Sequence, residues 1–225
     1  MDPKQLAGQT AVSYIKSGMI VGLGTGSTAK LFIDALGAAL ANGQLKDIKG
    51  IPTSIRSEQQ AQRLGIPLTT FAESPVLDVT VDGADEVAPG LNLIKGLGGA
   101  MLREKLVAQN SRRLVIVADD SKRVAALGTK SPLPVEVAQF SYQASERFLR
   151  GLGCVPTLRQ AEGGGPYVTD NGNYIYDCKF ARIDDPRALD EKLSHRAGIV
   201  ETGLFLDMAD TVLLAGTDSV ETLKR

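Results

Sequence analysis

The amino-acid sequence predicts an α/β protein: a Rossmann-like, mostly parallel sheet flanked by helices, with an inserted smaller α+β domain. First, short apolar runs of strand length alternate with helix-like segments over the first two-thirds of the chain. Second, glycine-rich or acidic loops follow several of these runs, as they do at the carboxyl ends of parallel strands. Third, after Pro134 the order changes to β-α-β-β-α-β, the ferredoxin-like unit.

The first part of the chain opens with a helix, because Asp2 offers an N-cap and Pro3 fits the first helical position. Gly18 ends this helix. Further helices are expected over residues 29–40 and 55–64 and from about residue 100, with strands over 19–23, 49–52, 67–71, 76–81, 91–94 and 114–118. The strands at 76–81 and 114–118 are largely apolar and rich in β-branched residues, which is typical of strands buried on both faces.

The second part of the chain is expected to form the inserted domain. Its strands are predicted over 135–140, 154–158, 174–177 and 199–205, and its helices over 142–150 and 185–195. A glycine-rich turn at 162–166 leads into a hairpin whose turn residues are 169–173. Residues 211–215 are expected to return to the first sheet. The predicted division is therefore a catalytic domain of residues 1–130 plus 206–225 and a ferredoxin-like domain of residues 131–205.

Composition narrows the function classes. The 225 residues include 25 Lys and Arg against 26 Asp and Glu, a net charge of −1, which argues against nucleic-acid binding. No apolar run reaches membrane-spanning length and the N-terminus is no signal peptide, so we expect a cytoplasmic protein without a membrane partner. Cys154, Cys178 and His195 are too few for a zinc or haem site, so metal chemistry would have to use carboxylates alone.

The loop of residues 24–28 (GTGST) lies between a strand and a helix, where backbone N–H groups and hydroxyls can hold a phosphate. The alternative is a tight turn in which Ser27 or Thr28 only caps the helix. A dinucleotide site would also need an acidic residue at the end of the second strand, whereas Asp47 precedes that strand. A P-loop is excluded because no lysine follows the last glycine.

Three further loops carry candidate chemistry. Residues 82–86 (DGADE) hold three carboxylates, whose repulsion favours a nearby cation; Glu86 is expected to be solvated. Residues 95–99 (KGLGG) precede a helix in whose first turn Glu104 lies, either as a partner of the helix dipole or as a base. Lys122 follows 119–121 (DDS) and is either a phosphate ligand or an ordinary exposed lysine.

Taken together, these loops resemble the ribose-5-phosphate isomerase A family. The matching segments occur in the family's order over essentially the whole chain: 21–29 (VGLGTGSTA), 81–86 (VDGADE), 94–100 (IKGLGGA), 103–105 (REK), 118–122 (ADDSK), 132–137 (PLPVEV), 169–173 (TDNGN) and 203–205 (GLF). One departure is Leu97, where some members have another glycine.

The resemblance implies cofactor-free interconversion of ribose 5-phosphate and ribulose 5-phosphate in the pentose phosphate pathway, without a metal. It places the general base on Glu104 and assigns ring opening and movement of a hydroxyl proton to Asp82. Lys95, with Asp85, would stabilise charge that develops on the substrate oxygens. The substrate-binding positions that it implies are Lys4, Thr25, Gly26, Ser27, Thr28, Gly83, Ala84, Gly96, Leu97, Gly98 and Lys122.

The same resemblance implies a homodimer or homotetramer. Other functions remain open on this type of sheet, because fold alone does not decide function. A sugar-phosphate deaminase would normally place a histidine in the site, whereas the single histidine here, His195, lies in the predicted small domain. A coenzyme A transferase would form a thioester on a glutamate, and a sensing module would bind the sugar phosphate without converting it.

Overall fold

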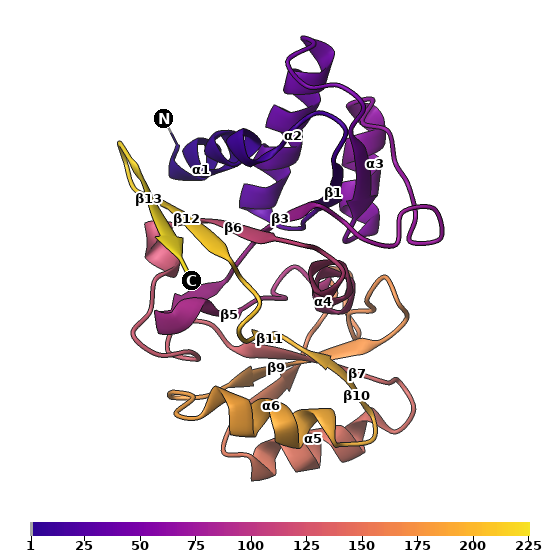
Figure 1. The fold of residues 1–225 in the computed structure, drawn as a ribbon. Helices are drawn as coiled ribbons and strands as arrows, with labels where there is room; N and C mark the ends of the chain where they lie inside the picture. Colours follow the sequence, from indigo (N-terminus) through magenta and orange to yellow (C-terminus); the bar gives the residue numbers. More distant parts are fainter. Residues whose placement is uncertain (1) are drawn as a thin grey trace. The chain divides into compact units, whose positions relative to one another are not determined.

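The computed structural model describes residues 2–225 and divides the chain into two compact units (Figure 1). The first unit comprises residues up to 84, 103–122 and 207–225, and the second comprises 85–102 and 123–206. These ranges differ from the division expected from the sequence, because residues 85–102 group with the second unit. An inserted domain of residues 131–205 alone stays a prediction.

The first unit is built on a six-stranded sheet in the order β13-β12-β6-β3-β1-β2. Its strands are β1 (Ile20–Leu23), β2 (Lys49–Pro52), β3 (Val79–Gly83), β6 (Leu114–Asp119), β12 (Thr211–Ala215) and β13 (Val220–Lys224). Its helices are α1 (Pro3–Ala11), α2 (Ser27–Ala41), α3 (Ile55–Arg63) and most of α4 (Met101–Gln109), with short 3₁₀ segments at Val12–Tyr14 and Asp120–Lys122. All neighbours are parallel except β12 and β13. The prediction of a mostly parallel α/β sheet is confirmed.

The strand order of this sheet reverses at β1, which lies between β2 and β3. The chain passes from β1 through α2 to β2 on one side of β1, and then through α3 to β3 on the other side. Leu23, near the end of β1, is in register with Pro52 and Val81. Open parallel sheets bind ligands where the strand order reverses in this way.

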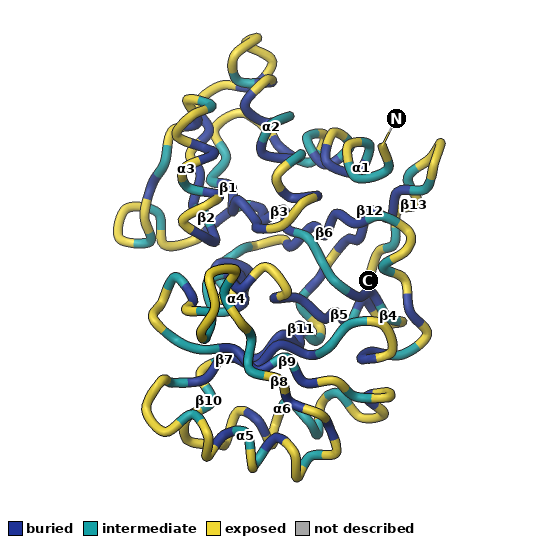
Figure 2. Tube along the Cα trace, turned by 180° about the vertical axis from the view of Figure 1, so that it is seen from behind, coloured by how far each residue is buried: buried dark blue, intermediate teal, exposed yellow. Residues whose placement is uncertain are grey.

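Burial explains how helices attach to this sheet. Val21 and Leu23 of β1 face a core to which Phe32 and Leu36 of α2 contribute. Figure 1 shows α1, α2 and α3 on the same face, and Figure 2 shows the inner strands as continuously buried. On the other face, a Cβ added at Gly22 would come within 2.8 Å of Val107 Cγ1 on α4. Glycine at this position lets α4 approach β1 closely.

The second unit contains the ferredoxin-like unit expected from the sequence. Its strands β7 (Leu133–Val137), β8 (Val155–Leu158), β9 (Tyr174–Lys179) and β10 (Ile199–Thr202) form an antiparallel sheet in the order β10-β7-β9-β8. Its helices are α5 (Tyr142–Gly151) and α6 (Pro186–Ser194). A smaller sheet joins β4 (Glu86–Ala88), β5 (Asn92–Ile94) and β11 (Leu204–Phe205) in the order β11-β5-β4, with a 3₁₀ segment at Pro89–Leu91. This pairing explains why residues 85–102 belong to the unit.

Several local predictions are wrong. Residues 67–71 form a single bridge at Leu68 instead of a strand, because Pro67 has no amide hydrogen and the chain turns where Ser74 N donates to Thr70 O at 2.8 Å. By contrast, residues 169–173 do make the predicted turn, which is closed by a hydrogen bond from Gly172 N to Thr169 O. The strand expected over 199–205 is divided into β10 and β11 at Gly203, whose amide donates to Pro134 O.

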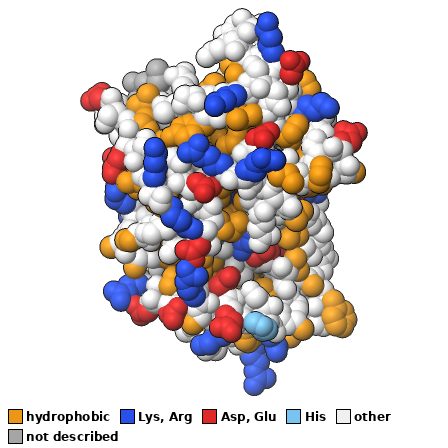
Figure 3. All heavy atoms as spheres, in the orientation of Figure 1, with side chains coloured by type: hydrophobic (Ala, Val, Ile, Leu, Met, Phe, Trp, Pro, Cys, Tyr) orange, Lys and Arg blue, Asp and Glu red, His pale blue; other side chains and the backbone are white. Residues whose placement is uncertain are grey.

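The chain's surface and helices agree with the composition. Figure 3 shows acidic and basic side chains interspersed over the face in view, as a net charge of −1 suggests. Within residues 2–225, none of the helices combines the length and the apolar character that crossing a membrane requires.

Candidate active site

In the first unit, the glycine loop after β1 packs directly against Asp82 of β3. The buried Asp82 carboxylate accepts hydrogen bonds at Oδ1 from Thr25 N at 2.9 Å and from Gly83 N at 2.7 Å. A Cβ on Gly24 would lie 2.2 Å from the same oxygen and 2.5 Å from Asp82 Cα, so only glycine fits there. The structure thus brings together two sequence-predicted parts, residues 24–28 and the end of β3 with the half-buried Gly83 and Ala84.

The Thr25 side chain lies beneath this loop. Its hydroxyl is within 2.7 Å of Thr53 Oγ1 and donates to Ser54 Oγ at 2.8 Å. Ser57 Oγ donates to Gly24 O at 2.6 Å, and Ser54 caps α3 by accepting from Ser57 N. A buried hydroxyl network therefore fixes the loop to the start of α3. The Thr25 hydroxyl thus serves this network, while its amide serves Asp82.

The N-terminus of α2 is arranged for an anion. The N-cap residue is Gly26, with φ of +115°, and it has no side chain with which to cap the helix. Ser27 and Thr28 are therefore the first two helical residues and not the cap; Ser27 is exposed and Thr28 is buried. The first N–H groups of a helix have no intrahelical acceptor, and the helix dipole favours negative charge there.

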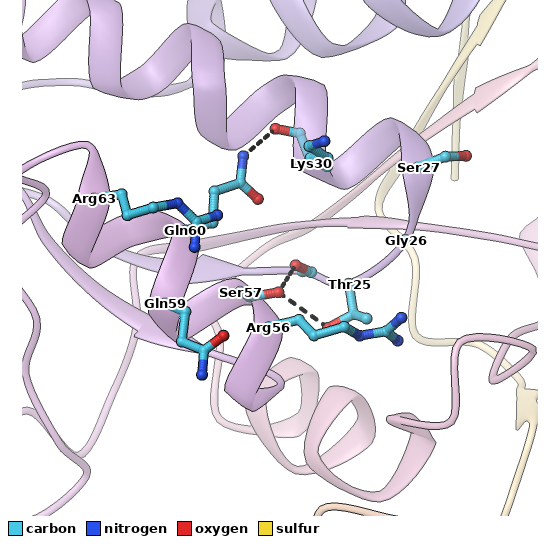
Figure 4. Close-up of a pocket in the computed structure, with 10 residues that line it drawn as sticks. Thr25, Gly26, Ser27, Lys30, Arg56, Ser57, Gln59, Gln60 and Arg63 are labelled. Atoms are coloured by element: carbon cyan, nitrogen blue, oxygen red, sulfur yellow. Dashed lines mark hydrogen bonds between the residues drawn. The ribbon is translucent and has the colours of Figure 1, made fainter. Parts of the chain in front are cut away.

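A cavity of about 410 Å³ opens beside this loop (Figure 4). Gly24, Gly26 and Ser27 line it together with the cationic side chains of Lys30, Arg56 and Arg63, and none of the ten described residues that line it is acidic. Gln60 connects the two helices, since its Nε2 donates to Lys30 O at 2.8 Å. The sequence interpretation missed these cations because they lie on α2 and α3 and not in a glycine-rich motif.

Glu104 lies in the first turn of α4, and its side chain is only 3% exposed. The end of α4 is at the amino edge of the sheet, where Leu77 N donates to Asn110 O at 2.9 Å. The beginning of α4 must therefore lie toward the carboxyl ends of the strands. Glu104 is one helical turn closer to that edge than Val107, which packs against β1 at Gly22.

Two lysines of this unit, Lys122 and Lys4, are predicted substrate-binding positions. Lys122 ends the 3₁₀ segment that follows β6, and its side chain is half-buried. Lys4 is the second residue of α1, where its amide donates to the N-cap side chain of Asp2 at 3.2 Å. Both belong to elements that follow or pack against the six-stranded sheet.

In the second unit, Asp85 and residues 95–99 form one structure. Asp85 Oδ2 accepts from Leu97 N at 3.0 Å, and Asp85 N donates to Ile94 O at 2.8 Å. Lys95 is only 2% exposed, and its Nζ lies 5.2 Å from the centre of the Phe205 ring, a cation–π contact. Gly96, with φ of +100°, is buried, while Leu97 and Gly98 are exposed. A buried ammonium beside an open glycine loop can stabilise a developing negative charge.

Glu86 corrects a sequence expectation, because it is completely buried and not solvated. Its carboxylate accepts three backbone hydrogen bonds, from Gly128 N at 2.7 Å, Lys130 N at 2.7 Å and Ser131 N at 2.6 Å. Its role is therefore to hold the 128–131 loop. The N–H donors lie more than forty residues later in the chain, so no local pattern could reveal them.

The remaining candidates for nucleophilic or metal chemistry are structural. Hydrogen bonding with the Cys154 thiol and burial raise the pKa of Cys178, so this thiol stays protonated at neutral pH. His195 is the C-cap of α6, with Nδ1 2.7 Å from Glu191 O. Across residues 2–225, no cluster of three or more His, Cys, Asp or Glu side chains has a geometry that could hold a metal ion.

Known proteins resemble this chain over most of its length. Residues 49–219 match the family described as ribose 5-phosphate isomerase A (phosphoriboisomerase A). The chain is 49% identical to the ribose-5-phosphate isomerase A of Synechococcus sp. (strain JA-3-3Ab), over 99% of this chain and 96% of that protein.

Solved structures agree. A D-ribose-5-phosphate isomerase in complex with phospho-erythronic acid superposes with a TM-score of 0.97 at 39% identity, covering 100% of this chain and 98% of the other. The ribose 5-phosphate isomerase A of Methanocaldococcus jannaschii gives a TM-score of 0.95 at 41% identity, covering 100% and 99% of the two chains.

Proposed function

The chain belongs to the ribose 5-phosphate isomerase A family, and from this membership we propose how its own residues carry out the reaction. It is an aldose–ketose isomerase that interconverts ribose 5-phosphate and ribulose 5-phosphate, and its substrate is therefore a sugar phosphate. The observation that carries the mechanistic proposal is the buried Glu104 carboxylate in the first turn of α4, toward the carboxyl edge of the sheet.

Glu104 acts as the base. In the open-chain aldose, its carboxylate removes the proton from C2, and the electrons of that C–H bond form an enediolate with the C1 carbonyl. The glutamic acid then returns the proton to C1 while the proton of the C2 hydroxyl moves to the oxygen on C1, which yields the ketose. A base placed on a rigid helix can reach both carbons with small movements.

Asp82 and Lys95 serve the oxygen atoms. Asp82 assists opening of the sugar ring and moves a hydroxyl proton, since its carboxylate is fixed by the amides of Thr25 and Gly83. Lys95, with Asp85 holding its loop through the Leu97 amide, stabilises the negative charge of the enediolate. Electrostatic stabilisation of this kind is often the largest contribution to catalysis.

The phosphate and hydroxyl groups are held by backbone and lysine groups. The uncapped start of α2, including Gly26, Ser27 and Thr28, provides N–H groups and hydroxyls for an anion. Lys122 and Lys4 add positive charge, and the remaining binding positions are Thr25, Gly83, Ala84, Gly96, Leu97 and Gly98.

We propose that the enzyme needs no cofactor. The reaction needs a base, a stabiliser of oxyanions and a phosphate ligand, so it proceeds without a metal or another cofactor. The protein acts in the cytoplasm, in the non-oxidative pentose phosphate pathway, as a homodimer or homotetramer. A net charge of −1 supports the absence of nucleic-acid partners.

A coupled assay that separates ribose 5-phosphate from ribulose 5-phosphate tests this function in both directions. We expect conversion in dialysed buffer, solvent deuterium incorporated at C1 or C2 during turnover, and competitive inhibition by phospho-erythronic acid, which a relative binds in its solved structure. Binding of ribose 5-phosphate without conversion would indicate a sensing module instead. A glutamyl thioester detected by mass spectrometry after incubation with an acyl coenzyme A would indicate a transferase.

A further inference from the structure

Arg159 contacts the glycine loop that follows β5 from a distant part of the second unit. It comes directly after β8, and its side chain is 14% exposed. Its Nη1 donates to Gly96 O at 3.2 Å and to Leu97 O at 3.1 Å. One guanidinium therefore holds two successive carbonyl groups of a loop that lies about sixty residues earlier in the chain.

The guanidinium is itself fixed. Nε donates to Asp177 Oδ2 at 2.9 Å and Nη2 donates to Asp177 Oδ1 at 2.5 Å, a two-pronged ion pair that sets the plane of the guanidinium. Asp177 lies on β9, in register with Thr157 of β8 and Pro134 of β7. The sheet, and not a flexible loop, therefore determines where the remaining Arg159 donor points.

The loop needs such an external support. Gly96 and Gly99 have φ angles of +100° and +80°. Because glycine has no side chain, the backbone at these two positions can also adopt other conformations. Tyr167 supplies a second contact, because a Cβ on Gly99 would lie 2.4 Å from its hydroxyl oxygen. The Arg159 guanidinium lies 5.8 Å from the centre of the Tyr167 ring, and Tyr167 N donates to Arg159 O at 2.8 Å.

The geometry of the peptide bond determines the direction in which the N–H groups of this loop point. The C=O and N–H of a trans peptide point in opposite directions. With the Gly96 carbonyl directed at Arg159, the Leu97 N–H points away, and it does so toward Asp85, to which it donates at 3.0 Å. With the Leu97 carbonyl directed at Arg159, the Gly98 N–H must likewise point away from the guanidinium.

We propose that Arg159 is a positioning residue for the isomerase reaction: it orients the amides of residues 97 and 98 and holds the backbone next to Lys95. This inference rests on the proposed function, in which residues 95–98 bind the substrate and stabilise the enediolate. Arg159 acts through this loop and does not itself contact the substrate. Lysine cannot replace it, because an ammonium lacks the planar fork that serves Asp177 and two carbonyls together.

The test compares Arg159→Lys and Asp177→Asn with Arg150→Lys, a matched control in which an exposed arginine of α5 pairs with Glu146 at 2.7 Å. For both Arg159→Lys and Asp177→Asn we expect kcat to fall on the order of 10- to 100-fold, because small displacements of catalytic groups have effects of this size. KM should change less than threefold and the circular-dichroism spectrum should stay that of the parent. Arg150→Lys should retain the parent's kcat.

The outcomes separate this inference from the proposed function. If the parent chain does not interconvert the two sugar phosphates, the function is wrong and no variant is needed. If the parent is active, but folded Arg159→Lys keeps its kcat within twofold, the positioning role is overturned. A lower melting temperature with kcat per folded molecule unchanged would likewise assign Arg159 to stability alone and reject the proposal.

Discussion

At the residue scale, burial distinguishes Glu104 from an ordinary helix-capping glutamate. A carboxylate in the first turn of a helix gains about 0.3–1 kcal/mol from the helix dipole, and it gains this while exposed to water. Glu58 occupies the equivalent turn of α3 and is only half-buried, whereas Glu104 is 3% exposed. Removing a carboxylate from water costs several kcal/mol. The helix dipole alone does not account for this placement, which supports the role of base proposed for Glu104.

We therefore expect Glu104→Gln to fold and to bind the sugar phosphate but to lose about 10²–10⁴ in kcat, the usual contribution of a positioned acid–base group. The amide is nearly isosteric and cannot accept the C2 proton. Steady-state kinetics measure the effect, and Glu58→Gln is the control, with turnover like the parent's. If Glu104→Gln turns over within a few-fold of the parent, Glu104 is not the base.

Lys122 gives a second prediction at this scale. The proposed role is binding of the substrate phosphate, which is present equally in the ground state and the transition state. Lys122→Ala should therefore raise KM strongly while kcat changes little, as loss of uniform binding does. Lys179→Ala, an exposed lysine at the end of β9, provides the comparison and should leave KM unchanged. An unaltered KM in Lys122→Ala would remove this lysine from the binding site.

At the scale of elements, Glu86 shows how one buried side chain closes a loop. Its carboxylate joins β4 to residues 128–131 through the amides of Gly128, Lys130 and Ser131. Gln at this position can accept with only one oxygen, so its NH₂ group would face an N–H donor. Gly128 has φ of +79° and packs against Ile183, which leaves the loop little room to move away.

Glu86→Gln should accordingly lower the free energy of unfolding by about 1.5–3 kcal/mol, the range for hydrogen bonds to charged groups. Urea denaturation followed by circular dichroism measures this change. Glu191→Gln, on the exposed side of α6, should stay within about 0.5 kcal/mol of the parent. Equal stability of the two variants would contradict the assigned role of the Glu86 carboxylate.

We expect Tyr176 on β9 to make the second unit less stable at alkaline pH. Burial, and then the negative charge of Glu146, raise its pKa to about 12, against about 10 in an unfolded chain. The folded state thus favours the neutral phenol. Its contribution is fully present below pH 10 and is lost as the pH rises through 12.

We expect the urea midpoint of the parent to fall between pH 10 and 12 more steeply than that of Tyr176→Phe, which has no phenol to ionise. The difference between the two proteins isolates this group from other groups that titrate in the same range. Parallel pH dependences of the two midpoints would show that Tyr176 does not contribute.

At the scale of the whole molecule, the sequence predicted what local patterns encode. Apolar runs marked the parallel strands, and the loops after them marked Asp82, Glu104 and the start of α2. The contacts that hold the loops are long-range. Thr25 forms a hydrogen bond with Thr53, and Glu86 and Arg159 hold loops about forty and sixty residues away in the chain. Hydrophobic periodicity carries no information about such long-range partners. The sequence did not predict the cations Arg56 and Arg63 either, because the local sequence around an exposed helical arginine does not show whether its side chain lines a cavity.

The proposed independence from metals and other cofactors concerns the whole molecule and can be tested directly. Activity should be unchanged after exhaustive EDTA treatment and dialysis, with metal content measured by mass spectrometry. The carboxylates that a dependence on Mg²⁺ would implicate are Asp82 and Asp85. Each already accepts a hydrogen bond from a backbone amide: Asp82 from Thr25 N and Gly83 N, and Asp85 from Leu97 N. A hard cation would compete with these amides for the same oxygens and release the loops they hold. Loss of activity that added Mg²⁺ restores would instead make the two carboxylates metal ligands, and the roles proposed for Asp82 in proton movement and for Asp85 in holding the loop would have to be abandoned.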